Sequence, residues 1–429
     1  MNLVKNKIFQ NASWIIISKI IQSILGLVVS LLTARYLGPS NFGIINYAAS
    51  LVTFVSPIVF LGINNVLVKE FSQKPEKEGQ VLGTSLVMSL CSAIVCIVGI
   101  ISFSLICDAG QTETIAVTAI YSLILLFQVL DLVQYWFQTK LLSKYTALVS
   151  LFAYICITAY KIFLLVTKKP VYWFAASNVL DYLLISLLLL IFYRKLGGQK
   201  LSFSARMAKE IFNSSKHYIV TGLMVAVFSQ TDKIMLKHMI DETATGLYAS
   251  ATTIATLTAF VYAAIIDSFR PVVFQAANDS NEKFESSIVK LYSIIIYLSL
   301  LQAIVMTLLA KPIVGLLYGS QFLGAVSALR IIVWFNTFSY IGSIRNIWIL
   351  VHEKQKYLWM INLSGAVLNV ILNYFWIPIW GGNGAAFASL ITQIFSNFIL
   401  SYLILPIRKN NRLILQSLNP KHIYQMLKQ

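Results

Sequence analysis

The sequence predicts an all-α integral membrane protein with about twelve transmembrane helices in two lobes of six. Hydrophobic residues make up 58% of the 429 residues, and charged residues only 11%. The mean hydropathy is +0.76, whereas an ordinary soluble domain has roughly 25% charged residues. Apolar runs long enough to cross about 30 Å of hydrocarbon recur along the whole chain. Composition therefore excludes a cytosolic enzyme and a disordered chain.

Each predicted span is an apolar run of about 20 residues or more. The first six spans are expected at residues 12–35, 42–66, 81–105, 113–138, 146–167 and 171–194. The second six are expected at residues 217–239, 244–268, 288–310, 324–350, 355–378 and 382–405. Pro312, Gly315 and Gly319 interrupt the stretch 311–330, where a re-entrant segment is the alternative. The first apolar run is too long for a signal peptide and is expected to remain as a span.

The distribution of Lys and Arg predicts the orientation in the membrane. With the N-terminus inside, the inner segments hold 23 of these residues and the outer segments five. Both termini are therefore expected in the cytoplasm. This asymmetry, with basic residues among anionic lipid headgroups, accounts for most of the net charge of +17. Nucleic acid is not an expected partner, but membrane lipids are.

A weak internal repeat supports two lobes. An offset of 203 residues places Gly43 on Gly246, just after the first outer turn of each half. Since each half has an even number of spans, an axis along the membrane normal should relate the two. The domains expected are a first lobe at 1–195, a cytoplasmic linker with a short amphipathic helix at 196–216, a second lobe at 217–407 and a basic cytoplasmic tail at 408–429.

Charged side chains within spans are costly and are functional candidates by default. They are Lys19, Lys161, Lys233, Arg330, Arg345, Asp131, Asp181, Asp232 and Asp267. Asp181 lies nearest the middle of its span, too deep to reach water by extending its side chain. Anchoring at the interface is the alternative for Lys161, Arg330 and Arg345, and a local ion pair with Arg270 is expected for Asp267.

Neutral polar residues recur at helical spacing in several spans. Examples are Gln128, Gln134 and Gln138; Asn362, Asn369 and Asn373; and Ser389, Gln393 and Asn397. Such stripes predict either hydrogen bonds between helices or a polar interior. An interior of amides, hydroxyls and ammonium groups suits a polar, anionic solute such as a sugar or phosphate. The sequence shows no catalytic motif, metal-ligand spacing or cofactor motif, so no catalytic residue, metal or cofactor is predicted.

Three segments resemble a known family. TARYLGPSNFGIINYAASLVTF (33–54) is similar to the opening of the Wzx-type polysaccharide flippases, which translocate lipid-linked oligosaccharides. FSQTDKIMLKHMIDETATGLYASA (228–251) and LLYGSQFLGAVSALRIIVWF (316–335) add to this resemblance. The superfamily also holds the lipid II flippases and the multidrug and toxin extruders (MATE). It implies a MATE-like fold of two six-helix lobes related as parallel repeats, which open alternately to the two sides.

The resemblance also implies a function. We expect a flippase in the bacterial inner membrane that moves undecaprenyl-pyrophosphate-linked oligosaccharide repeat units from the cytoplasmic to the outer leaflet, for surface polysaccharide of the O-antigen or capsule type. By analogy, the cationic cavity would be lined by Lys19, Arg35, Lys161, Lys233 and Arg330. Candidate carriers of a coupling proton are Asp131, Asp181 and Asp232. A polysaccharide polymerase and chain-length machinery are the expected protein partners.

Two other functions stay open at this point. A multidrug or cation antiporter is one, although Lys19 stands in the first span, where drug extruders commonly use an acidic residue. An integral-membrane polysaccharide polymerase or ligase is the other. Such an enzyme is expected to carry catalytic residues on a sizeable outer loop, and the predicted outer loops are short.

Overall fold

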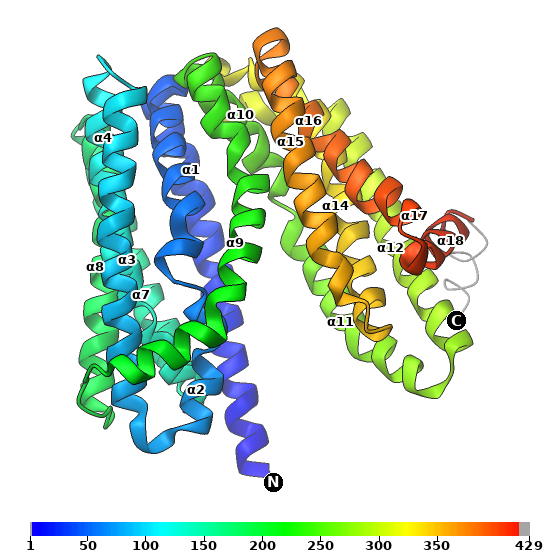
Figure 1. Ribbon diagram of the computed structural model, residues 1–429. Coiled ribbons are helices and arrows are strands. Elements are labelled where there is room, and N and C mark those ends of the chain that lie inside the picture. Colours follow the sequence, from blue (N-terminus) through cyan, green and yellow to red (C-terminus); the bar gives the residue numbers. More distant parts are fainter. Residues whose placement is uncertain (1, 420–429) are drawn as a thin grey trace. The chain divides into compact units, whose positions relative to one another are not determined.

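The computed structural model describes residues 2–419, and their side chains from residue 21 onward except Ile24. All regular structure in this part of the chain is helical (Figure 1). Eleven helical stretches are long and apolar enough to cross a membrane. The first of them, Ile21–Val59, contains two helices, so the expected twelve spans and the eleven stretches agree. The protein is thus an all-α, multi-pass membrane protein.

The first two spans form one element, α1 (Asn2–Val59), that is broken at Gly38. A straight helix of 58 residues would be about 87 Å long, far more than a bilayer requires. Gly38 has φ 74° and ψ 173°, a conformation that suits glycine, and Pro39 then fits the first turn of the second helix. Figure 1 shows the chain rising from the N-terminus and returning toward α2 (Leu67–Gln73). The second helix ends at Val59, earlier than the predicted residue 66.

The chain divides within α9 into two compact units, residues 1–230 and 231–429. Besides α1 and α2, the helices of unit 1 are α3 (Glu78–Cys107), α4 (Thr112–Ser122), α5 (Ile124–Leu130), α6 (Val133–Thr139), α7 (Ser143–Val166), α8 (Val171–Lys195) and the first part of α9 (Ala205–Met239). The predicted span 113–138 is therefore three short helices, with breaks at Leu123 and at Asp131. Ala48, Val117 and Phe174 are central in one core cluster of this unit.

Unit 2 follows the same pattern of long helices and short connections. Its helices are α10 (Glu242–Thr256), α11 (Ala259–Asp279), α12 (Asn281–Leu308), α13 (Ala310–Tyr318), α14 (Ala325–Val351), α15 (Leu358–Trp380), α16 (Gly382–Ile394), α17 (Leu400–Leu403) and α18 (Arg408–Ser417). The irregular stretch 311–330 begins with α13 and a 3₁₀ turn at Ser320–Phe322. Tyr292, Ile344 and Trp348 lie at the centre of the core. The predicted boundaries of lobes and linker remain predictions.

Only part of the segment 196–216, which was expected to hold a short amphipathic helix, is helical. Residues 196–204 are not helical, and α9 begins at Ala205 and continues without interruption through the seventh span. The non-helical part lies along α3: the Ser202 amide donates to the Gly79 carbonyl (3.2 Å), and the Gly79 amide donates to Oε1 of Gln199 (3.0 Å). The non-helical part of the linker is therefore fixed to α3 by one main-chain hydrogen bond and one that uses the Gln199 side chain.

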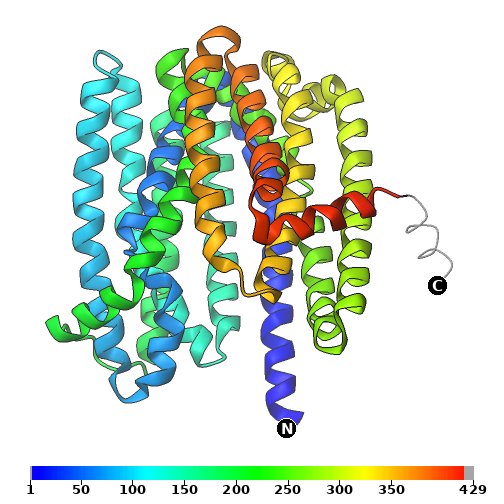
Figure 2. The same cartoon turned by 45° about the vertical axis from the view of Figure 1, so that its right-hand side comes forward.

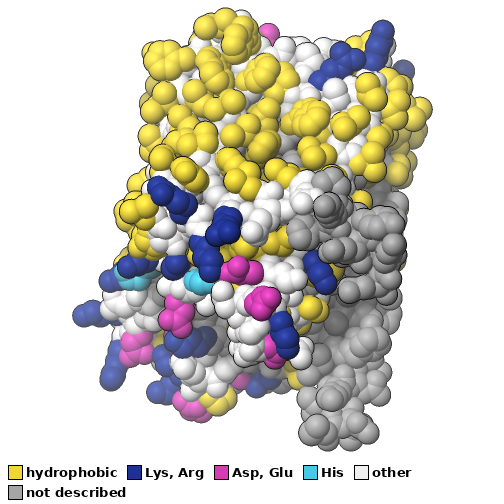
Figure 3. Space-filling model, turned by 90° about the vertical axis from the view of Figure 1, so that its right-hand side faces the viewer, with side chains coloured by type: hydrophobic (Ala, Val, Ile, Leu, Met, Phe, Trp, Pro, Cys, Tyr) yellow, Lys and Arg dark blue, Asp and Glu magenta, His cyan; other side chains and the backbone are white. Residues whose placement is uncertain are grey.

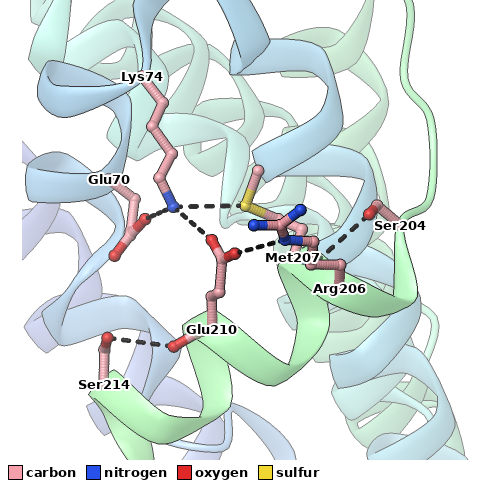
Figure 4. Close-up of polar contacts among 7 residues, drawn as sticks. All are labelled: Glu70, Lys74, Ser204, Arg206, Met207, Glu210 and Ser214. Atoms are coloured by element: carbon pink, nitrogen blue, oxygen red, sulfur yellow. Dashed lines mark hydrogen bonds and ion pairs between the residues drawn. The ribbon is translucent and has the colours of Figure 1, made fainter.

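Charged side chains at α2 hold the first turns of α9. Figure 4 shows Lys74 between Glu70 and Glu210, with nitrogen–oxygen distances of 2.9 and 3.0 Å. The hydrogen bond with Glu70 raises the pKa of Lys74 above its ordinary value. Met207, one turn earlier on α9, is buried. In Figure 1 this part of α9 runs across unit 1 before the helix turns along the other helices.

Candidate functional site

Three charged residues that lie far apart in sequence interact inside unit 1, with Asp181 linking the other two. The break between α5 and α6 positions Asp131, while Lys161 lies on α7 and Asp181 on α8. The Lys161 ammonium donates to Oδ1 of Asn178 (2.9 Å) and interacts electrostatically with Asp181. Asp181 in turn lies close enough to Asp131 to interact with its charge. We call Asp131, Lys161, Asn178 and Asp181 the unit 1 charge cluster.

This cluster has unused hydrogen-bonding capacity. Oδ1 of Asp131, Oδ1 of Asp181 and Oε1 of Gln128 are buried atoms without a hydrogen-bond partner among the described residues. Leaving a buried acceptor unpaired costs about 1–3 kcal/mol, and more for a charged group. The parent side chains are only half-buried. The cluster can therefore accept hydrogen bonds from water or from a solute that reaches it.

Tyrosine hydroxyls border the cluster. Tyr154 interacts electrostatically with Asp181, and Tyr182 with both carboxylates. Gly26 brings α1 against Tyr154 so closely that a Cβ atom there would lie 2.4 Å from the Tyr154 hydroxyl oxygen. The surroundings thus supply donors for oxygen-rich groups, on the helices of the fifth and sixth predicted spans.

In unit 2, Asp232 joins four helices. Its carboxylate accepts hydrogen bonds from the Tyr248 hydroxyl, the Ser389 hydroxyl and the Asn373 amide, each at 2.6 Å. These residues come from α9, α10, α16 and α15, and Asp232 is only 5% exposed. The Asn373 amide also donates to Asn369 (3.0 Å). Asn373 and Ser389, which belong to two of the predicted polar stripes, therefore make hydrogen bonds between helices here.

The remaining cationic candidates are not gathered into either group. Lys233 follows Asp232, is half-buried and interacts with the charge of Asp232. Arg35 is exposed near the Gly38 break, and Arg330 is exposed on α14. The side chain of Lys19 lies outside the described residues. The expected ion pair of Asp267 with Arg270 is confirmed, with a nitrogen–oxygen distance of 3.1 Å.

Arg345 is buried, which sequence reasoning did not favour over interfacial anchoring. It is only 3% exposed and donates to the Ser396 carbonyl (2.9 Å), the Ser401 hydroxyl (3.3 Å) and Oδ1 of Asn346 (3.1 Å). Ser396 belongs to a π-helical turn, Phe395–Ile399, that continues α16. Arg345 lies in α14, a helix with many buried residues. The depth of Arg345 along its span did not by itself predict that its side chain is buried.

Within the described residues, no group of three or more His, Cys, Asp and Glu side chains is arranged to hold a metal ion.

The sequence matches the polysaccharide biosynthesis protein family over residues 8–277, more than half of the chain. The chain belongs to this family. No curated protein matches the chain in sequence. Among solved structures it is similar to the lipid II flippase MurJ in an inward closed conformation, with 18% identity, a TM-score of 0.72, and coverage of 94% of this chain and 90% of MurJ.

A second similar structure is an inward-facing multidrug resistance MATE family transporter of the MOP superfamily. It has 15% identity and a TM-score of 0.66, with coverage of 92% of this chain and 95% of the transporter. An outward-facing MATE transporter gives a TM-score of 0.54 at 15% identity, with 96% of both chains covered. At such low identities, the likeness to these structures shows the fold alone, and the fold is that of the MOP superfamily transporters. These structures confirm the predicted fold class, and the match over residues 8–277 confirms the family.

Proposed function

We propose that the protein is a flippase that moves undecaprenyl-pyrophosphate-linked oligosaccharide repeat units from the cytoplasmic to the outer leaflet of the bacterial inner membrane. The observation that carries this proposal is membership in the polysaccharide biosynthesis family on a membrane-transporter fold. A transporter fold fits the physical task, which is to hide a polar head from about 30 Å of hydrocarbon. The product would serve surface polysaccharide of the O-antigen or capsule type.

The unit 1 charge cluster supports a polar, anionic cargo. Lys161 presents an ammonium group, and the neighbouring tyrosine hydroxyls and the Asn178 amide can bond sugar hydroxyls. In the proposal, Lys161 contacts pyrophosphate or glycan, together with Lys19, Arg35, Lys233 and Arg330. The polyprenyl tail stays in lipid. Polysaccharide polymerase and chain-length proteins then receive the unit at the outer face, and both termini of the flippase are cytoplasmic.

Coupling to a proton is assigned within the proposal to Asp131 or Asp181. Both have a carboxylate oxygen without a hydrogen-bond partner in the described chain, so a proton can be added without first breaking a bond. Asp232 is the third candidate, but it already accepts three hydrogen bonds. Protonating it would disturb the contacts that join four helices of unit 2. The difference favours the unit 1 carboxylates.

The test is transport by purified protein in liposomes that contain an undecaprenyl-pyrophosphate-linked oligosaccharide. A membrane-impermeant glycosidase reports how much glycan reaches the outside. We expect the wild-type protein to speed translocation and Lys161→Gln to slow it about tenfold, the effect of one charge-assisted hydrogen bond. The matched control is Lys311→Gln, an exposed lysine of α13. If folded wild-type protein does not speed translocation of the glycan, the proposed flippase function is refuted.

A multidrug or cation antiporter is the second candidate, favoured by the likeness to the MATE fold. Its signature would be drug resistance that depends on a cation gradient in cells that express the protein. Failure of that assay, with glycan translocation intact, leaves the flippase as the function.

A further inference from the structure

A cavity at one end of unit 2 lies apart from the charged residues described so far. It has a volume of about 620 Å³ and is formed between the start of α12 and the helix α18. Its lining consists of Glu282, Glu285, Ser286, Val289, Arg412, Leu415, Gln416 and Asn419. The volume is within the usual range of small-ligand sites, about 300–1,000 Å³.

The walls of this cavity are held firmly. The Tyr292 hydroxyl of α12 donates to Oδ1 of Asn410 (3.0 Å), and the Ser293 hydroxyl donates to the Ser417 carbonyl (2.9 Å). The Tyr297 hydroxyl donates to the Leu418 carbonyl (2.8 Å). Leu413 and Ile414 complete the contact as part of the apolar core. Figure 2 shows α18 lying across the long helices rather than along them.

The cavity lies where the surface changes from charged to apolar. The first turns of α12 carry Glu282, Lys283 and Glu285, whereas its later exposed side chains are apolar: Leu298, Leu301, Ile304, Val305 and Leu308. Figure 3 shows such a change on the face that it displays, with hydrophobic side chains above and charged ones gathered below. A helix that lies across this boundary, as α18 does, is typical of the membrane interface.

The charges around the cavity are mixed and balanced. Arg412 is exposed and makes no ion pair among the described residues, and the same is true of Glu282. Glu285 is paired with Lys409 at 2.6 Å. The lining therefore holds two carboxylates and one guanidinium, and the neighbouring Lys409 ammonium neutralises one of the carboxylates. Such a site matches a ligand with a negative and a positive group better than a purely anionic one.

We propose that this cavity binds the headgroup of a phospholipid that carries a phosphate and a primary ammonium, as phosphatidylethanolamine does. Arg412 contacts the phosphate, with which a guanidinium can form two parallel hydrogen bonds. The ammonium lies against Glu282. The acyl chains run over Leu415 and Leu418, whose side chains are 54% and 47% exposed. This proposal is independent of the transported substrate.

The test is native mass spectrometry of the delipidated full-length protein, titrated with phosphatidylethanolamine, phosphatidylcholine or phosphatidylglycerol. Phosphatidylcholine keeps the phosphate and positive charge but has no N–H donor, and phosphatidylglycerol has no positive group. We expect phosphatidylethanolamine to bind about tenfold more tightly than either, the scale of one charge-assisted hydrogen bond. Equal binding of phosphatidylglycerol would overturn the proposed headgroup.

Two variants locate the site. Arg412→Gln should lower phosphatidylethanolamine affinity about tenfold, while Glu282→Gln should abolish its advantage over phosphatidylcholine. Both side chains are exposed, so folding should survive, and the unfolding temperature checks this. Arg194→Gln, another exposed arginine, is the matched control. Unchanged phosphatidylethanolamine affinity in both variants would overturn the site. Equally tight binding of soluble glycerophosphoethanolamine would show that the ligand need not be a lipid, and would overturn that part of the proposal.

Discussion

A Cβ atom placed on Gly83 of α3 would lie 2.5 Å from the carbonyl oxygen of Ser202 and 2.7 Å from its amide nitrogen. Cβ atoms do not approach main-chain atoms so closely, so only glycine allows the two segments to pack at this distance. Gly79 has the same relationship to Lys200, whose carbonyl oxygen would lie 2.3 Å away. The non-helical part of the linker is thus fitted to α3 by shape as well as by hydrogen bonds.

Substituting Gly83 should therefore release the linker. Gly83→Ala should lower the free energy of unfolding by about 1–3 kcal/mol, because the main chain must move to admit a methyl group. Gly99→Ala on the same helix meets no atom within 4 Å and should raise it by about 0.5–1 kcal/mol, since alanine favours a helix. Unfolding in detergent measures both, and proteolysis at 196–204 reports the release. Equal effects of the two substitutions would contradict the packing.

Asp232 should matter more for stability than its position in a single helix suggests. Asp232→Ala removes the acceptor of two buried hydroxyls and of one N–H of the Asn373 amide, and should destabilise unit 2 by about 3 kcal/mol or more. The control is Asp267→Ala, whose side chain is 64% exposed and pairs, among the described residues, with Arg270 alone; a change within about 0.5 kcal/mol is expected there. Thermal unfolding of the two variants distinguishes them. A stable Asp232→Ala protein would show that water replaces the carboxylate.

The charges of Lys161 and Asp181 should be coupled. Lys161→Gln or Asp181→Asn alone leaves the other charge half-buried without its partner, whereas the double variant removes both. The free-energy cost of the double variant should therefore be smaller than the summed costs of the single variants, by about 0.5–3 kcal/mol. A double-mutant cycle on unfolding, repeated on the transport rate, measures this. Strict additivity would mean that the two groups act independently.

His352 should make unit 2 sensitive to acid. Its ring stacks on Trp348 at 3.9 Å between centroids, and burial lowers its pKa below the ordinary value of 6.5. The unfolded chain then binds the proton more readily, so stability is complete above about pH 6.5 and is lost as the pH falls through the lowered pKa. His352→Phe keeps the stacking and removes the titration. Its unfolding temperature should fall less between pH 7 and pH 5 than that of the wild type, and parallel curves would contradict this.

Some features of the site could be predicted from the sequence, whereas others depend on which helices pack against each other. Asp267 and Arg270 lie three residues apart on a helix, so local spacing sufficed to predict their ion pair. Lys161 and Asp181 belong to different spans, and the sequence identified each as costly but not as neighbours. Arg345 was ambiguous because depth along a span does not reveal which helices surround a side chain. The linker was expected as a surface helix, but residues 199–202 pack against Gly79 and Gly83 in a non-helical conformation.

The sequence by itself determined the membrane class, the number of spans and the family. These depend on hydrophobicity summed over about 20 residues and on local motifs, neither of which requires knowledge of distant contacts. Only the tertiary structure decided that Asp232 joins four helices, that Asp181 interacts with both Asp131 and Lys161, and that a cavity forms beside α18. The physical reason is that a hydrogen bond or ion pair inside a bundle depends on which helix faces turn toward each other, and packing of the whole unit sets those faces.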